Sequence, residues 1–102
     1  MTSQGSAHGR FRRAVERRQV VQAETVAREL GFLSLENALA LVILYAGEES
    51  PKFDAAAVRW LARLALEGRD VRRVDVQLAS AALLSLRGLR RERAEKTLLG
   101  LL

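Results

Sequence analysis

The chain has 102 residues, 49% of them hydrophobic and 5% aromatic, which is enough material for one domain with a core of mainly Leu, Ala and Val. It contains no cysteine, which excludes disulfides, thiolate zinc sites and cysteine nucleophiles. The net charge of +5 comes mostly from Arg, and an Arg- and Ala-rich composition is typical of GC-rich genomes, so the basic charge alone does not indicate nucleic-acid binding.

Residues 1–9 are small and polar, and we expect them to form a disordered tail ahead of a single helical domain at residues 10–102. They do not resemble a secretory signal, and no apolar run approaches the ~20 residues that cross a bilayer, so we expect a cytoplasmic protein with no membrane contact. His8, the only histidine, lies in this segment, which argues against a histidine-based metal site or catalytic triad.

Residues 10–30 carry two apolar stripes on different helical faces. The first stripe ends at Val15 and the second begins at Val20, and the two are rotated by roughly 120° at ~100° per residue. Because one straight helix cannot bury both stripes against one surface, the pattern predicts a break near residues 17–19. One bent helix and two short helices both fit this pattern, and Gly31 is expected to end the segment.

Residues 35–46 form the most apolar stretch of the chain. After Asn37 the stretch contains no charged or strongly polar side chain. As a helix it has no polar face, so its neighbours must cover it on most sides. Ser34 is the expected N-cap and Gly47 the expected end, and we predict that this helix lies at the centre of the fold.

Residues 50–51, a Ser-Pro pair, predict the start of a further helix at residues 51–67, because proline suits the first helical position. Its apolar face includes Trp60, which we expect in the core rather than at a binding surface. Arg63 and Glu67 are four residues apart and are expected to form an ion pair.

Two more helical segments are predicted after Gly68. Asp70 is the candidate cap of the first of them, in which residues 76–86 carry no charge. The last segment, residues 89–102, is rich in Arg at its start and in Leu at its end.

These elements predict a compact all-α bundle of about five helices, joined by short loops around the central apolar helix. The predicted core consists of Val26, Leu30, Leu35, Leu39, Val42, Ile43, Ala57, Trp60, Leu61, Leu64, Leu78, Ala82 and Leu86.

The sequence offers little for catalysis. It contains no glycine-rich phosphate loop and no pair of carboxylates that spacing alone brings together. We therefore expect no enzymatic activity, no small-molecule substrate, no cofactor and no metal.

Two surface features bear on function, and the first is a surplus of apolar residues beyond one small core. The candidates for contact with a protein partner or a second copy are Val76, Leu84, Leu99 and Leu102. They favour a non-enzymatic protein-interaction module, which binds a partner or itself through an apolar helix face.

The second feature is a basic cluster near each end of the chain. The candidates for nucleic-acid contact are Arg10, Arg12, Arg13, Arg17, Arg18, Arg90, Arg91 and Arg93. If the two clusters lie on one side of the fold, they form a patch for phosphate groups, so a nucleic-acid-associated regulator is the alternative function.

Residues 34–39 (SLENAL), 53–64 (FDAAAVRWLARL) and 76–83 (VQLASAAL) resemble helices of short Ala/Arg/Leu-rich proteins encoded in actinobacteria. The resemblance covers roughly residues 14–88 and lies in the pattern of helix faces. Because that family has no assigned activity, the resemblance implies an all-helical fold and an actinobacterial source, and it transfers no site residue. The chain departs from the family at residues 72–73, where two Arg replace the usual Ser or Thr cap.

Overall fold

The computed structural model describes residues 6–68, 72–88 and 90–102. Within these residues the chain forms six α-helices and no β-strand, which confirms the predicted all-α class. The helices are α1 (Ala7–Glu16), α2 (Val20–Leu30), α3 (Leu35–Gly47), α4 (Phe53–Glu67), α5 (Arg73–Ser85) and α6 (Arg91–Gly100). There are six helices rather than about five because residues 10–30 form two short helices instead of one bent helix.

The break between α1 and α2 lies at residues 17–19, as the rotation between the two apolar stripes predicted. Arg18 adopts a left-handed conformation with φ of 57°. The Gln19 N–H then donates to the Ala14 carbonyl and the Arg18 N–H to the Val15 carbonyl, which is the hydrogen-bond pattern of a Schellman motif. Because an arginine occupies the position usually taken by glycine, the sequence shows no typical turn residue at this break.

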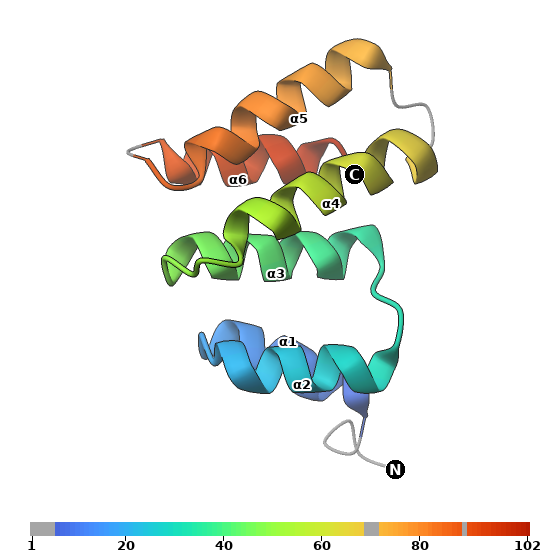
Figure 1. Ribbon diagram of the computed structural model, residues 1–102, viewed down its shortest axis with the longest axis vertical. Helices are drawn as coiled ribbons and strands as arrows, with labels where there is room; N and C mark the ends of the chain where they lie inside the picture. Colours follow the sequence, from blue (N-terminus) through green and yellow to red (C-terminus); the bar gives the residue numbers. More distant parts are fainter. Residues whose placement is uncertain (1–5, 69–71, 89) are drawn as a thin grey trace.

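The helix α3 is the central element, as predicted. Leu39 and Val42 are almost fully buried in the main hydrophobic cluster, together with residues of α4, α5 and α6. On the other side of the helix, Leu44 is buried in a second cluster with residues of α1 and α2. Figure 1 shows α3 between the α1–α2 pair and α4. Ser34 caps the helix as predicted, since its Oγ accepts the Asn37 N–H at 3.0 Å.

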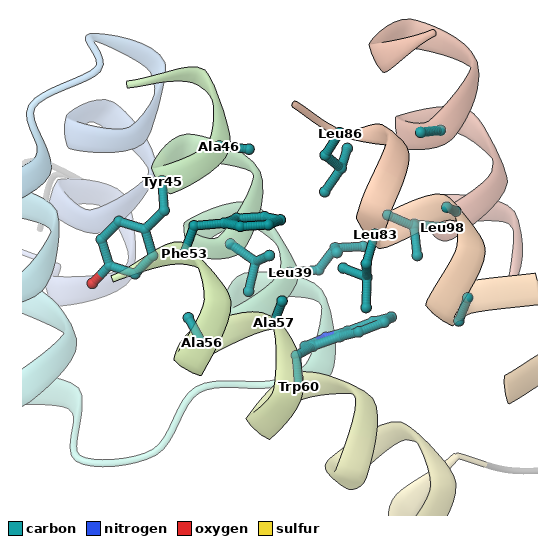
Figure 2. Packing of buried hydrophobic residues seen from close by; sticks show 14 of the residues in the cluster. Leu39, Tyr45, Ala46, Phe53, Ala56, Ala57, Trp60, Leu83, Leu86 and Leu98 are labelled. Atoms are coloured by element: carbon teal, nitrogen blue, oxygen red, sulfur yellow. The ribbon is translucent and has the colours of Figure 1, made fainter. Parts of the chain in front are cut away.

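The six helices form three antiparallel hairpins, α1–α2, α3–α4 and α5–α6, which follow one another along the 43 Å long axis (Figure 1). The α1–α2 and α3–α4 turns lie at the left edge of the view, and the connection between α2 and α3 lies at the right edge. Figure 2 shows the main core, in which Leu39, Phe53 and Trp60 meet Leu83 and Leu98 from the last hairpin.

Two helices begin at residues other than those predicted. The helix α1 begins at Ala7, inside the segment expected to be a tail, because Ser6 Oγ accepts the Gly9 N–H at 3.0 Å and caps the helix. Residues 1–5 lie outside the described residues. The helix α4 begins at Phe53, two residues later than predicted, because Ser50 and Pro51 belong to a turn that precedes it.

At the start of α5, the predicted cap Asp70 lies outside the described part of the chain. The described cap is Arg72, whose N–H donates to the Asp75 carboxylate at 3.0 Å. An acid three residues into the helix thus satisfies a donor at the helix start where no Ser or Thr is present.

The predicted core is wrong at Leu78, whose side chain is 49% exposed. The buried face of α5 is centred on Ala79 and Leu86, and Leu78 lies beyond its edge. Four other predicted core residues, Leu30, Leu35, Ile43 and Leu61, are half-buried. The residues that are buried in addition to those predicted are Phe11, Ala14, Ala23, Leu44, Tyr45, Ala46, Phe53, Ala56, Ala79, Leu83, Ala94 and Leu98.

Candidate interaction surfaces

The helix α4 is apolar on two opposite faces. One face enters the main core, where Trp60 and Leu64 are almost fully buried. On the other face, five exposed residues without charge lie within about 60° of the direction opposite Trp60. We call these residues the outer stripe of α4; they are Ala55, Val58, Ala62, Ala65 and Leu66. Val58 is 68% exposed and Leu66 is 87% exposed.

A shallow apolar groove borders the outer stripe. Its volume is about 210 Å³, and its lining includes Val58 and Leu61 of α4 and Leu84 of α5. At one end, Arg87 lies 3.9 Å from the Asp54 carboxylate and 5.4 Å from the centroid of the Phe53 ring. The groove therefore connects the outer stripe with Leu84, which is 80% exposed and was predicted to contact a partner.

The other predicted partner residues lie elsewhere. Val76 is half-buried near the start of α5. Leu99 and Leu102 are exposed, but they belong to α6 and its end, whereas the groove at Leu84 is formed by α4 and α5. Sequence reasoning singled out Leu84, which borders this groove, and did not include Val58 and Leu66, although their spacing on α4 is visible in the sequence.

The two basic clusters lie in different parts of the stack. Figure 1 shows α1 at the lower end and α6 in the upper half, with α3 and α4 between them. Members of both clusters nevertheless reach the end of α3, since Arg18 pairs with Glu48 and the Arg91 guanidinium lies against Gly47. The two clusters therefore approach each other at a point where the acidic residues Glu48 and Glu49 also lie.

Several of these arginines form ion pairs. Arg10 lies 2.7 Å from Glu29, and this contact lowers the pKa of the Glu29 carboxyl through a hydrogen bond and the adjacent positive charge. Arg18 lies 3.8 Å from Glu48, and Arg91 lies 3.0 Å from Glu95. Arg12 and Arg13 lie within α1, Arg17 at its C-cap, Arg90 at the N-cap of α6, and Arg93 in the first turn of α6.

A second groove, of about 230 Å³, lies between α3 and α4. Its floor includes Ala38, Leu41 and Val42, and its α4 wall includes Arg59 and Trp60. The indole N–H of Trp60 donates to the Leu35 carbonyl at 2.8 Å, which fixes the ring beside the groove.

One end of this groove is closed by a polar contact among three elements. The Tyr45 hydroxyl donates to Glu24 Oε2 at 2.5 Å, and Lys52 Nζ donates to the same oxygen at 2.8 Å. These hydrogen bonds, from Lys52 first and then Tyr45, lower the pKa of the Glu24 carboxyl, while burial and Glu24 raise the pKa of the Tyr45 hydroxyl. Figure 2 shows Tyr45 pointing away from the main core toward the first hairpin. The contact joins α2, α3 and the turn before α4.

The other end of the groove is held by Arg63. Its guanidinium donates to the Leu33 carbonyl at 2.8 Å, pairs with Glu67 at 2.8 Å and lies 4.8 Å from the centroid of the Phe32 ring. The pair with Glu67 was predicted from the spacing and is confirmed. Arg63 thereby fastens the connection between the first two hairpins to α4.

In the described residues, no three His, Asp or Glu side chains gather in a way that could hold a metal ion. The described helices also include none that is long and apolar enough to cross a membrane. Comparison of the chain with models of protein families, with curated proteins and with solved structures finds no match. A function for this protein therefore has to be inferred from the chemistry of its surfaces.

Proposed function

We propose that this protein is a non-enzymatic interaction module that associates with a second copy of itself through the outer stripe of α4. The observation that carries the proposal is the stripe itself, which leaves an exposed face without a cation along α4, with Asp54 at its edge, while the opposite face fills the core. Exposed apolar surfaces that are contiguous and rimmed by polar groups are typical of protein-interaction sites.

The spacing within the stripe favours a helix as the occupant. Ala55, Val58, Ala62 and Ala65 follow one another at intervals of three, four and three residues. This is the spacing of the contact seam between two packed helices, where side chains of one helix enter gaps on the other. The three alanines allow a second helix to approach closely, at an interaxial distance of about 8 Å.

Charge favours a second copy of the chain as the source of that helix. Each copy carries a net charge of +5, so two copies repel unless they meet on a face without cations. No residue of the outer stripe is charged, and Arg87 in the adjacent groove is paired with Asp54. This face brings two copies together with little repulsion.

The stripe is also complementary to itself. Val58 and Leu66 lie four residues before and after Ala62. When two α4 helices pack antiparallel with Ala62 at the twofold axis, each Val58 meets Leu66 of the other copy. A symmetric dimer requires this kind of contact, because the same patch must serve both partners.

Sedimentation equilibrium tests the proposal with the full chain. We expect a monomer–dimer equilibrium, and we expect Ala62→Glu to raise the dissociation constant of the dimer at least about a hundredfold, since two carboxylates would face each other across the axis. The matched control is Leu99→Glu, which adds the same charge to an exposed apolar position on α6 and should leave the equilibrium within about twofold. A wild-type chain that stays monomeric at all concentrations, or an Ala62→Glu variant that dimerises like the wild type, would contradict the proposal.

A further inference from the structure

The groove along α3 differs from the outer stripe of α4 in the charge at its rim. Its floor is apolar, with Ala38, Leu41 and Val42, whereas Arg59 forms part of its α4 wall. A neighbouring hollow, lined by Arg28 of α2 and Phe32 of the connection to α3, shares Leu33 and Arg63 with it. The two hollows together combine an apolar floor with cations on both sides.

The acids near this groove are already neutralised within the chain. Glu24 accepts hydrogen bonds from Tyr45 and Lys52, Glu29 is paired with Arg10, and Glu67 is paired with Arg63. Across the described residues, by contrast, neither Arg28 nor Arg59 forms an ion pair with a carboxylate. Arg59 in the wall of the groove and Arg28 in the neighbouring hollow are therefore two guanidinium groups that no carboxylate of the described residues contacts directly.

The two arginines lie at different places along the combined hollow. Arg59 of α4 belongs to the wall of the groove that contains Tyr45, and Arg28 of α2 lines the neighbouring hollow beside Phe32. Because Leu33 and Arg63 line both hollows, a ligand that extends from one into the other passes both guanidinium groups.

The length of the groove favours a protein segment over a small molecule. The α3 residues that line the groove run from Ala38 to Tyr45, which are about 10 Å apart at 1.5 Å per residue. The hollow at Phe32 extends it further toward the connection between hairpins. The groove alone matches about two turns of a helix, and its volume suits one large apolar side chain.

We infer that the groove along α3 binds an acidic, amphipathic segment of a partner protein. An apolar side chain of that segment occupies the hollow beside Trp60, and carboxylates on either side of it pair with Arg28 and Arg59. Helical ligands bind in this way when their apolar face enters a groove and their charged residues match its rim. This binding site is separate from the outer stripe of α4, so it does not depend on the self-association proposed above.

Titration with a synthetic peptide tests the inference on the full chain. The probe is a capped 12-residue peptide with Leu at helical spacing and Glu at the flanking positions, and its partner probe carries Gln in place of every Glu. Trp60 is the only tryptophan of the chain, so its fluorescence reports occupation of the groove. We expect saturable binding of the acidic peptide and binding at least about tenfold weaker for the Gln peptide.

The variant Arg28→Gln/Arg59→Gln separates recognition at the groove from general attraction to a basic protein. We expect it to weaken binding of the acidic peptide about tenfold. The matched control, Arg12→Gln/Arg93→Gln, removes the same charge from exposed positions outside the groove and should change binding no more than about twofold. The inference is overturned if the control variant loses as much affinity as the groove variant, or if neither peptide changes the fluorescence of Trp60.

Discussion

The helices α3 and α4 are both apolar on more than one face, yet they differ in how those faces are covered. Every residue of α3 except Glu36 is buried or half-buried, because α3 lies between the first hairpin and the rest of the stack. In α4, the face with Trp60 is buried and the opposite face with Val58 and Leu66 is exposed. An apolar face thus indicates that a helix needs a neighbour, and only its position in the stack decides whether that neighbour belongs to the same chain.

The largest expected effect comes from removing a side chain on the covered helix. Leu39→Ala should lower the free energy of unfolding by about 2–5 kcal/mol, because Leu39 is completely buried in the main core and the cavity cannot collapse fully. Leu66→Ala on the outer stripe should change it by less than about 0.5 kcal/mol in dilute, monomeric protein. Urea denaturation of both variants measures the difference, and equal losses would contradict the distinction between the two helices.

A smaller effect is expected where α3 makes its polar contact with α2. Tyr45→Phe removes the hydroxyl that donates to Glu24 at 2.5 Å, and we expect a loss of about 1–3 kcal/mol because the carboxylate is left with one fewer donor. Since the fold lowers the pKa of Glu24, its ionised form stabilises the protein at neutral pH, and this contribution disappears as pH falls through the lowered pKa.

Unfolding measurements at neutral and acidic pH test the sign of this linkage. Glu24→Gln should be less stable than the wild type at neutral pH, and the difference in their free energies of unfolding should become smaller in acid. Asp54→Asn is the matched control, because the side chain of Asp54 is 86% exposed and its replacement should change the free energy of unfolding little. A difference that grows in acid would contradict the assignment.

Substitutions in the turns on either side of α3 should change the free energy of unfolding in opposite directions. Glu49, just after the helix, has a left-handed φ of 53°, and Gly31, just before it, has a φ of 76°. Glu49→Gly should stabilise the protein by about 0.5–1 kcal/mol, because glycine adopts this conformation without strain. Gly31→Ala should destabilise it by about 1 kcal/mol or more for the same reason. Thermal melts of both variants decide the matter, and a destabilising Glu49→Gly would argue against the left-handed turn.

The smallest expected effect concerns the alternative function as a nucleic-acid-associated regulator. Because several arginines of the two basic clusters are already paired with acids, we expect only weak, sequence-independent binding to duplex DNA that disappears as salt is raised. Titrations of duplex DNA with the variants Arg12→Gln/Arg17→Gln and Arg90→Gln/Arg93→Gln measure how much each cluster contributes to the affinity. Tight binding at physiological salt that needs both clusters would favour the regulator over the interaction module.

Much of the fold could be predicted from the sequence because its signals were local. The uncharged run at residues 35–46 predicted the central helix, Ser34 predicted its cap, and the rotated stripes predicted the break after α1. The left-handed turns at Arg18 and Glu49 left no such signal, since neither residue is glycine.

The surfaces were harder to predict. The spacing of Ala55, Val58, Ala62 and Ala65 was present in the sequence, but spacing alone does not say which of two apolar faces enters the core. The groove along α3 could not be predicted, because it depends on how α3 and α4 pack against each other. The same is true of Leu78, which lines a hollow with Ala94 and Thr97 of α6 and is not covered by them.

Cysteine cross-linking tests the role of the exposed face of α4 most directly, because the chain has no cysteine of its own. In an antiparallel pair centred on Ala62, the variant Ala62→Cys should form a disulfide-linked dimer on mild oxidation, since the two positions lie at the closest approach of the helices. Val58→Cys should cross-link to Leu66→Cys when the two variants are mixed, and much less when either is oxidised alone. If Ala62→Cys links no faster than the control Leu99→Cys, the outer stripe of α4 is not a self-association surface.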